Sequence, residues 1–288
     1  MIDSHTHTRY SKHAVGTVDE LVEAAIQRQV KILTITDHAP FYIDTDNRLL
    51  SKELVSYLEE VNRARDRYAS QIKILVGLEL DYVPGSETFT RQLISGLELD
   101  FVIGSIHYVP VGRELVRVWD LPRLSDNAVL DAYFGALHEL LACGLFDAVG
   151  HADTLLRGVP EAELSERLKT LVPYFGDARI AYELNASGAR KSVYDAVTRQ
   201  EHAAGRPSYP CRPTVTALLA ARAAFTVGSD AHTPADVGGG IDAMLRDLAP
   251  LGLHAISYYE RRQRIDVPLS ELLVEPQGAS DRINGALV

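Results

Sequence analysis

Short apolar runs alternate along this chain with longer stretches whose apolar residues recur at helical spacing. Lys31 to Thr36 (KILTIT) is a compact β-branched run of the kind that forms buried strands. It is followed by a stretch in which Leu54, Leu58 and Val61 share one helical face. Strand, helix and strand in this order are typical of parallel βαβ units, so the pattern predicts an α/β fold.

The same alternation continues over most of the chain and predicts seven strands with helices between them. The strands are expected at the start of the chain and at 31–36, 72–80, 100–106, 146–150, 179–184 and 224–228. The helices are expected at 16–29, with Thr17 as N-cap, and at 50–69, 87–97, 127–141, 161–175 and 214–222. Residues 255–259 fit either an added strand or a helix start, and 275–288 resemble a loose tail. No linker or repeat interrupts the pattern, which favours one domain over residues 1–288.

Six of the seven predicted strands end in residues of metal-binding type. In a parallel barrel the carboxyl ends of the strands converge on one mouth, so these side chains are expected to meet in one cavity. The set consists of His5, His7, His13, His38, Glu79, His107, His151, Asp230 and His232. One zinc ion takes four ligands, and the larger number predicts two or three ions that share a bridging carboxylate.

Composition and charge narrow the classes of function. The hydrophobic fraction is 46% and the charged fraction 24%, both ordinary for a soluble globular protein. The net charge of -10 argues against a protein that wraps nucleic acid, which normally needs a basic surface. Cys143 and Cys211 are too few for a disulfide framework or a thiolate zinc site, and they fit a reducing cytoplasm. No signal peptide and no membrane span are expected.

Six short motifs together resemble the polymerase-and-histidinol-phosphatase (PHP) superfamily over about residues 1 to 240. They are Asp-x-His-x-His from residue 3, Thr-Asp-His from 36, Gly-x-Glu from 77, Gly-Ser-x-His from 104, Gly-His-x-Asp from 150 and Gly-Ser-Asp-Ala-His from 228. Within the superfamily the chain is most similar to the histidinol-phosphate phosphatases. That closer similarity rests on the chain length, the Thr-Asp-His-Ala-Pro turn, the insert before Glu79 and the segment 183–188.

The resemblance implies a distorted TIM-like (β/α)7 barrel with three divalent metal ions at the carboxyl ends of the strands. By similarity, the first ion is held by His5, His7, Glu79 and Asp230, the second by Glu79, His107 and His151, and the third by His13, His38 and His232. Imidazole and carboxylate ligands suit zinc, iron and manganese alike, so the identity of the metal stays open.

The implied activity is hydrolysis of L-histidinol phosphate to L-histidinol and phosphate, a step of histidine biosynthesis. A hydroxide formed from water acidified by the metal ions is expected to attack phosphorus. Arg157 and Arg190 are the candidates for contacts to the phosphoryl oxygens. Asp153 is expected either to protonate the leaving group or to orient a metal ligand. Tyr42 and Tyr108 are the candidates for substrate binding around the imidazole and the amine.

Two other functions remain open from the sequence. The first is a PHP phosphoesterase with another substrate, such as a small nucleotide, a nucleic-acid end or phosphotyrosine. The second is a non-catalytic PHP module that uses metals for stability or docking, which the full set of ligand types argues against. The expected partner is a small phosphorylated substrate, with neither nucleic acid nor a membrane involved, and the oligomeric state is not predicted.

Overall fold

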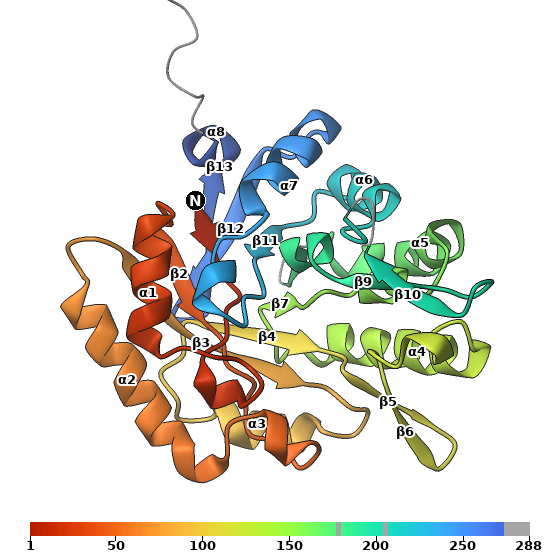
Figure 1. The fold of residues 1–288 in the computed structure, drawn as a ribbon, viewed down its shortest axis with the longest axis horizontal. Coiled ribbons are helices and arrows are strands. Elements are labelled where there is room, and N and C mark those ends of the chain that lie inside the picture. Colours follow the sequence, from red (N-terminus) through yellow and green to blue (C-terminus); the bar gives the residue numbers. More distant parts are fainter. Residues whose placement is uncertain (177–179, 204–206, 274–288) are drawn as a thin grey trace, which may run out of the picture.

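The centre of the molecule is a sheet of seven parallel strands, seen in a computed structural model that describes residues 1–176, 180–203 and 207–273 (Figure 1). Their order in the sheet is the order in the chain, β1-β2-β3-β4-β7-β8-β11. The strands are β1 (Ile2–Asp3), β2 (Ile32–Ile35), β3 (Lys73–Asp81), β4 (Phe101–Ser105), β7 (Ala148–Val149), β8 (Ala181–Asn185) and β11 (Phe225–Gly228). They are almost entirely buried, as expected for a parallel sheet covered by helices.

The sheet closes because the chain beyond β1 pairs with β11 and the residues after it. The Ser4 amide donates to the Val227 carbonyl at 2.9 Å, and the Asp230 amide donates to the His5 carbonyl at 2.8 Å. Thr6 and Ala231 form a further parallel bridge. The first and last strands of the sheet are thus joined, and the predicted α/β barrel of seven parallel strands is confirmed.

A helix follows every strand of the barrel, and the helices lie around the outside of the strands (Figure 1). They are α1 (Val18–Gln27), α2 (Leu54–Arg67), α3 (Glu87–Ile94), α4 (Asn127–Cys143), α5 (Glu161–Lys169), α6 (Arg212–Ala220) and α7 (Ile241–Leu248), with a short α8 (Leu269–Leu272) near the C-terminus. Thr17 caps α1 in a reciprocal capping box with Glu20, as the sequence predicts. Within the described ranges, no helix has the length and apolar character that crossing a bilayer requires.

Proline residues account for two differences between the predicted and observed helices. The helix expected at 161–175 ends at Lys169, and a separate short turn, Val172–Tyr174, contains Pro173, which has no amide hydrogen to donate. The helix expected from residue 214 already begins at Arg212, because Pro213 is compatible with a first helical turn. The expected start of β8 at residue 179 and the expected tail at 275–288 lie outside the described residues.

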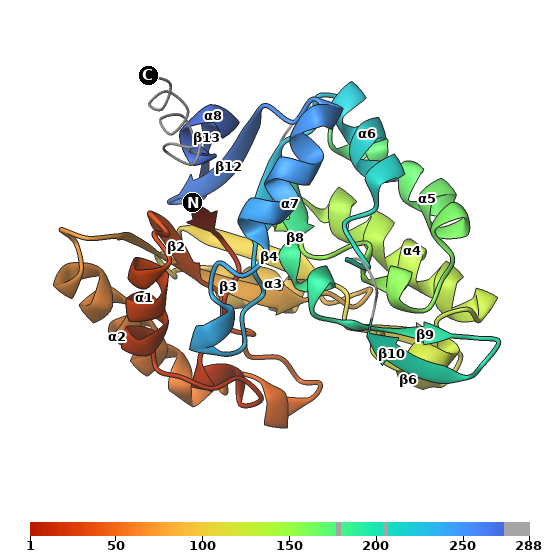
Figure 2. The ribbon, with the colours of Figure 1, turned by 45° about the horizontal axis from the view of Figure 1, so that its top comes forward.

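In the part of the chain that the structure describes, three antiparallel hairpins accompany the barrel (Figure 2). They are β5–β6 (Tyr108–Val111 and Glu114–Arg117), β9–β10 (Ser192–Asp195 and Gln200–Ala203) and β12–β13 (Ala255–Glu260 and Gln263–Pro268). The pattern at 255–259 therefore belongs to a strand. The Tyr259 hydroxyl donates to the carbonyl of Asp147, which precedes β7, and the ring of Tyr259 stacks on Phe101 at the start of β4. Hairpin β12–β13 thus covers the amino ends of the strands, opposite the mouth that carries the predicted ligands.

Candidate metal centre

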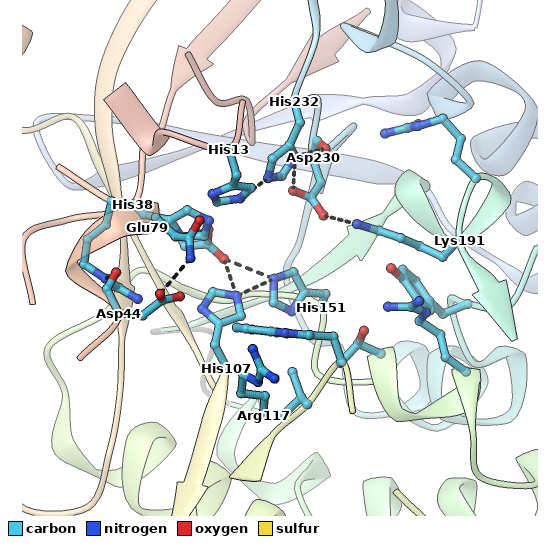
Figure 3. Close-up of a pocket in the computed structure, with 18 of the residues that line it drawn as sticks. His13, His38, Asp44, Glu79, His107, Arg117, His151, Lys191, Asp230 and His232 are labelled. Carbon is cyan, nitrogen blue, oxygen red and sulfur yellow. Dashed lines mark hydrogen bonds and ion pairs between the residues drawn. The ribbon is translucent and has the colours of Figure 1, made fainter. Parts of the chain in front are cut away.

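The nine residues predicted as ligands lie together at the carboxyl ends of the strands. Figure 3 shows His13, His38, His107, His151 and His232 directed toward a common space that also contains Glu79 and Asp230. His5 and His7 follow β1 and are completely buried beneath them. The barrel topology therefore brings together residues that are up to 227 positions apart in the sequence, as the first and last of the nine, His5 and His232, show.

Glu79, near the end of β3, occupies the middle of the cluster. Its Oε2 atom is 3.3 Å from His5 Nε2, 3.4 Å from His7 Nε2 and 2.9 Å from His38 Nδ1. Burial alone would raise the pKa of this carboxyl, but the charges of the surrounding histidines hold that pKa well below its usual range. Glu79 is thus an ionised carboxylate with several imidazole nitrogens around one oxygen.

The other oxygen of Glu79 faces a second pair of histidines. Glu79 Oε1 is 3.0 Å from His151 Nε2 and 3.4 Å from His107 Nε2, and these two nitrogens are 3.4 Å apart. Ser105 donates its hydroxyl to the same oxygen at 2.7 Å. One carboxylate therefore lies between two histidine groups, which is the arrangement of a bridging ligand.

Asp230 and His232 extend the cluster on the side of His7. Asp230 Oδ1 is 3.3 Å from His7 Nε2, and His232 Nε2 is 3.0 Å from His13 Nε2. The ring of His13 also stacks on that of His38, with centroids 5.2 Å apart. All three groups of residues that the resemblance assigns to individual ions are therefore in mutual proximity.

Several buried atoms in the cluster have no hydrogen-bond partner among the described residues. They include His5 Nε2, His7 Nε2, His38 Nδ1 and Glu79 Oε2. Polar atoms that are buried without partners cost free energy, yet here they converge on one another. A divalent cation would satisfy such atoms together, so the residues present fit a metal centre.

Among the residues that the structure describes, ligand-type atoms lie within 4.8 Å of one another in three sets. These sets are His5, His7 and Asp230; His7, His38 and His232; and His38, Glu79 and His107. The first belongs to the predicted first ion, whereas His38 falls into two sets rather than into the third ion alone. The assignment of individual ligands to individual ions stays a prediction.

The protonation of two histidines also suits metal binding. Burial and the charges of His232 and His38 hold the pKa of His7 well below its usual range. Burial likewise lowers the pKa of His232 to about 4. Both rings are therefore neutral near pH 7, the form in which imidazole binds a metal.

Glu183, in the middle of β8, fixes two of the candidate ligands. Its Oε1 atom is 2.6 Å from His5 Nδ1, and its Oε2 atom accepts the backbone amide of His151 at 2.7 Å. A carboxylate on the far nitrogen of a histidine sets the tautomer and the ring orientation. Glu183 is not among the predicted site residues, although it lies in the segment 183–188 that contributes to the closer similarity.

Asp81 has a similar role for His107. Its Oδ1 atom is 2.5 Å from His107 Nδ1, and its other oxygen forms a buried ion pair with Arg48. Burial opposes ionisation, but His107 and Arg48 hold the pKa of Asp81 at about 2. Because side chains two apart on a strand share a face, the spacing from Glu79 was the signal that could have identified Asp81.

Asp3 and Asp37 hold the backbone around the cluster in position. Asp37 accepts the amide of Thr8 at 2.8 Å and the hydroxyl of Ser11 at 2.7 Å. Asp3 accepts the amide of Ser229 at 2.8 Å and that of Gly238 at 2.7 Å. These bonds connect the opening segment of the chain to the loops after β2 and β11.

The backbone at two candidate ligands is unusual. His151 and Asp230 have positive φ angles of 27° and 52°, a backbone region that residues other than glycine rarely adopt. Each of the two residues lies shortly after the end of a strand. Nearby, Gly228 is packed so tightly that a β-carbon at this position would collide with His5 and Glu183. Backbone strain of this kind concentrates at functional sites, which agrees with the convergence of the side chains.

A cavity of about 530 Å³ opens beside the cluster. Arg157, Arg190 and Lys191 contribute to its wall. Arg157 donates Nε to the Ser192 carbonyl at 2.9 Å, and Arg190 donates Nη2 to the Ser229 carbonyl at 2.6 Å. Lys191, absent from the sequence prediction, places its ammonium 3.8 Å from Asp230 Oδ2. The predicted arginines therefore line the same cavity as the ligands, and a lysine joins them.

The remaining predicted site residues lie outside the set that lines this cavity. Asp153 is completely buried and accepts the Cys211 amide at 2.7 Å. Tyr108 is also buried and donates its hydroxyl to Asp44, while Tyr42 lies on the surface against Phe41. Their predicted roles in catalysis or substrate binding stay predictions. The cavity wall instead contains Trp119, which is not among the predicted site residues.

Comparison with known proteins identifies relatives over nearly the whole chain. A probable histidinol-phosphatase of Deinococcus radiodurans is 28% identical over 271 residues, covering 92% of this chain and 98% of that protein. A histidinol-phosphatase of Bacillus subtilis is 24% identical over 276 residues, covering 84% and 97%. The fold matches the crystal structure of histidinol phosphate phosphatase from Lactococcus lactis, solved with zinc, L-histidinol and phosphate. That match has a TM-score of 0.71 at 22% identity, covering 92% of this chain and 98% of that chain.

The sequence pattern of the PHP domain matches residues 3–187. This range contains seven of the nine residues of the cluster, from His5 to His151, together with the positioning residues Asp81 and Glu183. The match covers well over half of the chain, and the chain belongs to the PHP domain family.

Proposed function

We propose that this protein is a metal-dependent phosphomonoesterase that hydrolyses L-histidinol phosphate to L-histidinol and phosphate. The observation that carries the proposal is the convergence of unpaired buried nitrogens and oxygens around Glu79, at the wall of a cavity with cationic side chains. The relatives named as histidinol-phosphatases, and the related structure that contains L-histidinol and phosphate, support this substrate.

Hydrolysis of an alkyl phosphate monoester is among the slowest reactions in water, since the dianion repels a nucleophile and the alkoxide is a poor leaving group. In the proposal, the nine clustered residues hold divalent ions. Such ions, when bound, offset the charge of the phosphate and acidify the attacking water. Glu79 contributes an ionised carboxylate placed between two histidine groups, and neutral His7 and His232 offer free lone pairs.

The cations in the cavity wall are placed to bind the phosphoryl group. Arg157 uses part of its five donors on the carbonyl and hydroxyl of Ser192, and Arg190 uses part of its donors on two backbone carbonyls and the Asp236 carboxylate. These contacts fix the guanidinium planes and leave other N–H groups for the substrate. Lys191 adds a positive charge beside Asp230. These groups orient the phosphoryl group and neutralise its charge, so they favour a dianionic monoester over a neutral ligand.

We assign Asp153 to positioning rather than to protonation of the leaving group. It is buried, and its carboxylate accepts the amide of Cys211 in the segment before α6.

We also propose that the activity belongs to one domain spanning residues 1–288 and that the protein acts in the cytoplasm. The two cysteines support the latter, because both are free thiols.

The test is steady-state hydrolysis of L-histidinol phosphate beside a panel of nucleotides, sugar phosphates and p-nitrophenyl phosphate, on protein whose metal content is measured. We expect kcat/KM for L-histidinol phosphate to exceed that of every other compound by at least about 100-fold. A flat profile on metal-loaded protein would contradict the substrate and favour another phosphoesterase of the same family.

A further inference from the structure

Trp119 is the single tryptophan of the chain, and its indole is partly exposed in the wall of the cavity. It follows β6 in a turn that is fixed next to a candidate metal ligand, because the Val118 amide donates to the His107 carbonyl at 3.0 Å. The indole lies 6.2 Å from the His107 ring, centroid to centroid. A large aromatic surface is therefore exposed beside His107, a candidate ligand of the metal centre.

The neighbours of Trp119 hold the indole in place. Tyr108 contacts it edge to face, with centroids 5.2 Å apart and the planes at 78°. The Tyr108 hydroxyl is in turn bonded to Asp44, which also lines the cavity. The guanidinium carbon of Arg117 lies 5.8 Å from the indole centroid, a cation–π contact. The indole is thus supported by fixed groups, yet 40% of its surface stays exposed.

An aromatic side chain that is fixed and exposed in a cavity suits a flat ring as its ligand, because stacking buries apolar area at little cost in entropy. The positive charge of Arg117 favours a neutral ring over a protonated one. An imidazole with an ordinary pKa of about 6.5 is mostly neutral at pH 7.5. When the phosphoryl group is at the metal centre, the rest of a small substrate extends into the cavity that Trp119 lines.

We propose that Trp119 stacks on the imidazole of the substrate and thereby selects L-histidinol phosphate over phosphate monoesters without a ring. This inference rests on the proposed function and adds to it the residue that determines specificity. It also replaces the expectation that Tyr42 and Tyr108 make this contact, since Tyr42 lies on the surface and Tyr108 beneath the indole.

The test compares L-histidinol phosphate with O-phosphoethanolamine, which keeps the amine and the phosphate ester but lacks the ring. In Trp119→Ala we expect the ratio of their kcat/KM values to fall about tenfold, mainly through KM for L-histidinol phosphate. Trp119→Phe keeps an aromatic face and should retain most of the ratio. Leu115→Ala is the matched control, because Leu115 is exposed on the same hairpin but is not among the described cavity residues.

Fluorescence gives a reading that does not depend on turnover. Since Trp119 is the only tryptophan, L-histidinol should change the emission of the wild-type protein, whereas ethanolamine should not. This inference alone would be overturned if the ratio of kcat/KM values is unchanged in Trp119→Ala. It would also be overturned if kcat/KM falls equally for both substrates in a variant that melts like the wild type. A wild type without preference for L-histidinol phosphate would overturn the proposed function itself.

Discussion

Both ends of the barrel contain buried charged groups, but the two ends differ in whether these groups have hydrogen-bond partners. At the amino end, Asp100 accepts the Val76 amide at 2.9 Å and the Arg261 amide at 3.0 Å, and it pairs with Arg65. At the carboxyl end, Glu79 Oε2 and the Nε2 atoms of His5 and His7 lie close together without hydrogen bonds among the described residues.

Asp147 repeats the pattern of the amino end. It accepts the Val102 amide at 2.8 Å and pairs with Arg262 of the β12–β13 hairpin. A carboxylate with backbone and arginine partners stabilises the fold locally. Carboxylates and imidazoles that face each other without hydrogen-bond partners raise the free energy of the folded protein when no ligand is bound. A bound ligand that contacts these groups lowers that free energy. Buried polar groups without hydrogen-bond partners, more than the presence of charge, therefore distinguish a binding site from structural ion pairs.

The largest expected effect comes from replacing the shared carboxylate at the carboxyl end. Glu79→Gln removes the charge that both histidine groups face, so kcat should fall by about 10³-fold or more and the metal content should drop. Steady-state kinetics with metal analysis measures both. Near-wild-type turnover in this variant would remove the functional difference between the two ends.

The matched change at the amino end is Asp147→Asn, which should alter stability without altering kcat. Burial raises the pKa of Asp147 to about 6, so the folded state holds this proton more tightly than the unfolded state, whose pKa is 3.8. The stability linked to this proton is present below about pH 4 and is lost as the pH rises to about 6, by up to about 3 kcal/mol.

Denaturant unfolding of wild type and Asp147→Asn at several pH values checks this prediction. Asparagine does not titrate, so the stability of the wild type relative to the variant should decrease between pH 4 and pH 6. The metal ligands are the same in both proteins, and their titration therefore cancels in the difference. A constant difference across this range would show that Asp147 is ionised throughout.

A smaller effect is expected at Glu183, which orients ligands from outside the cluster. Glu183→Gln weakens the contact to His5 Nδ1 but keeps an acceptor for the His151 amide. Loss of such a partner typically costs 10- to 100-fold in metal affinity or activity, so about that loss is predicted. Isothermal titration with zinc measures the affinity, and an affinity equal to that of the wild type would assign Glu183 to the fold alone.

The sequence predicted the strands of the barrel well because each combines a compact apolar run with a polar end. Thr36 to His38 and Gly104 to His107 show this transition clearly, and both lie where β2 and β4 end. The parallel arrangement then follows from the helices between the strands. The convergence of the nine candidate ligands needed only this topology and the rule that parallel strands share a carboxyl end.

The hairpins and the lining of the cavity were much harder to predict. β10 is exposed along its length and β9 is only half-buried, so neither carries the alternation that reveals a strand with one buried face. Trp119 follows the unpredicted β6 strand, and nothing in its local pattern indicates which surface it faces. Lys191 and Glu183 gain their roles from contacts to Asp230 and His5, far away in the sequence.

The most direct test of this account is to remove the metals with a chelator, measure the residual metal content, and assay L-histidinol phosphate before and after metal is restored. We expect the protein as purified to contain two or three divalent ions per chain, kcat/KM to fall by at least about 10³-fold in the stripped protein, and restoration to recover it. Full activity in metal-free protein, or no metal uptake by the folded chain, would contradict the claim that the unpaired groups at the carboxyl end form a catalytic metal centre.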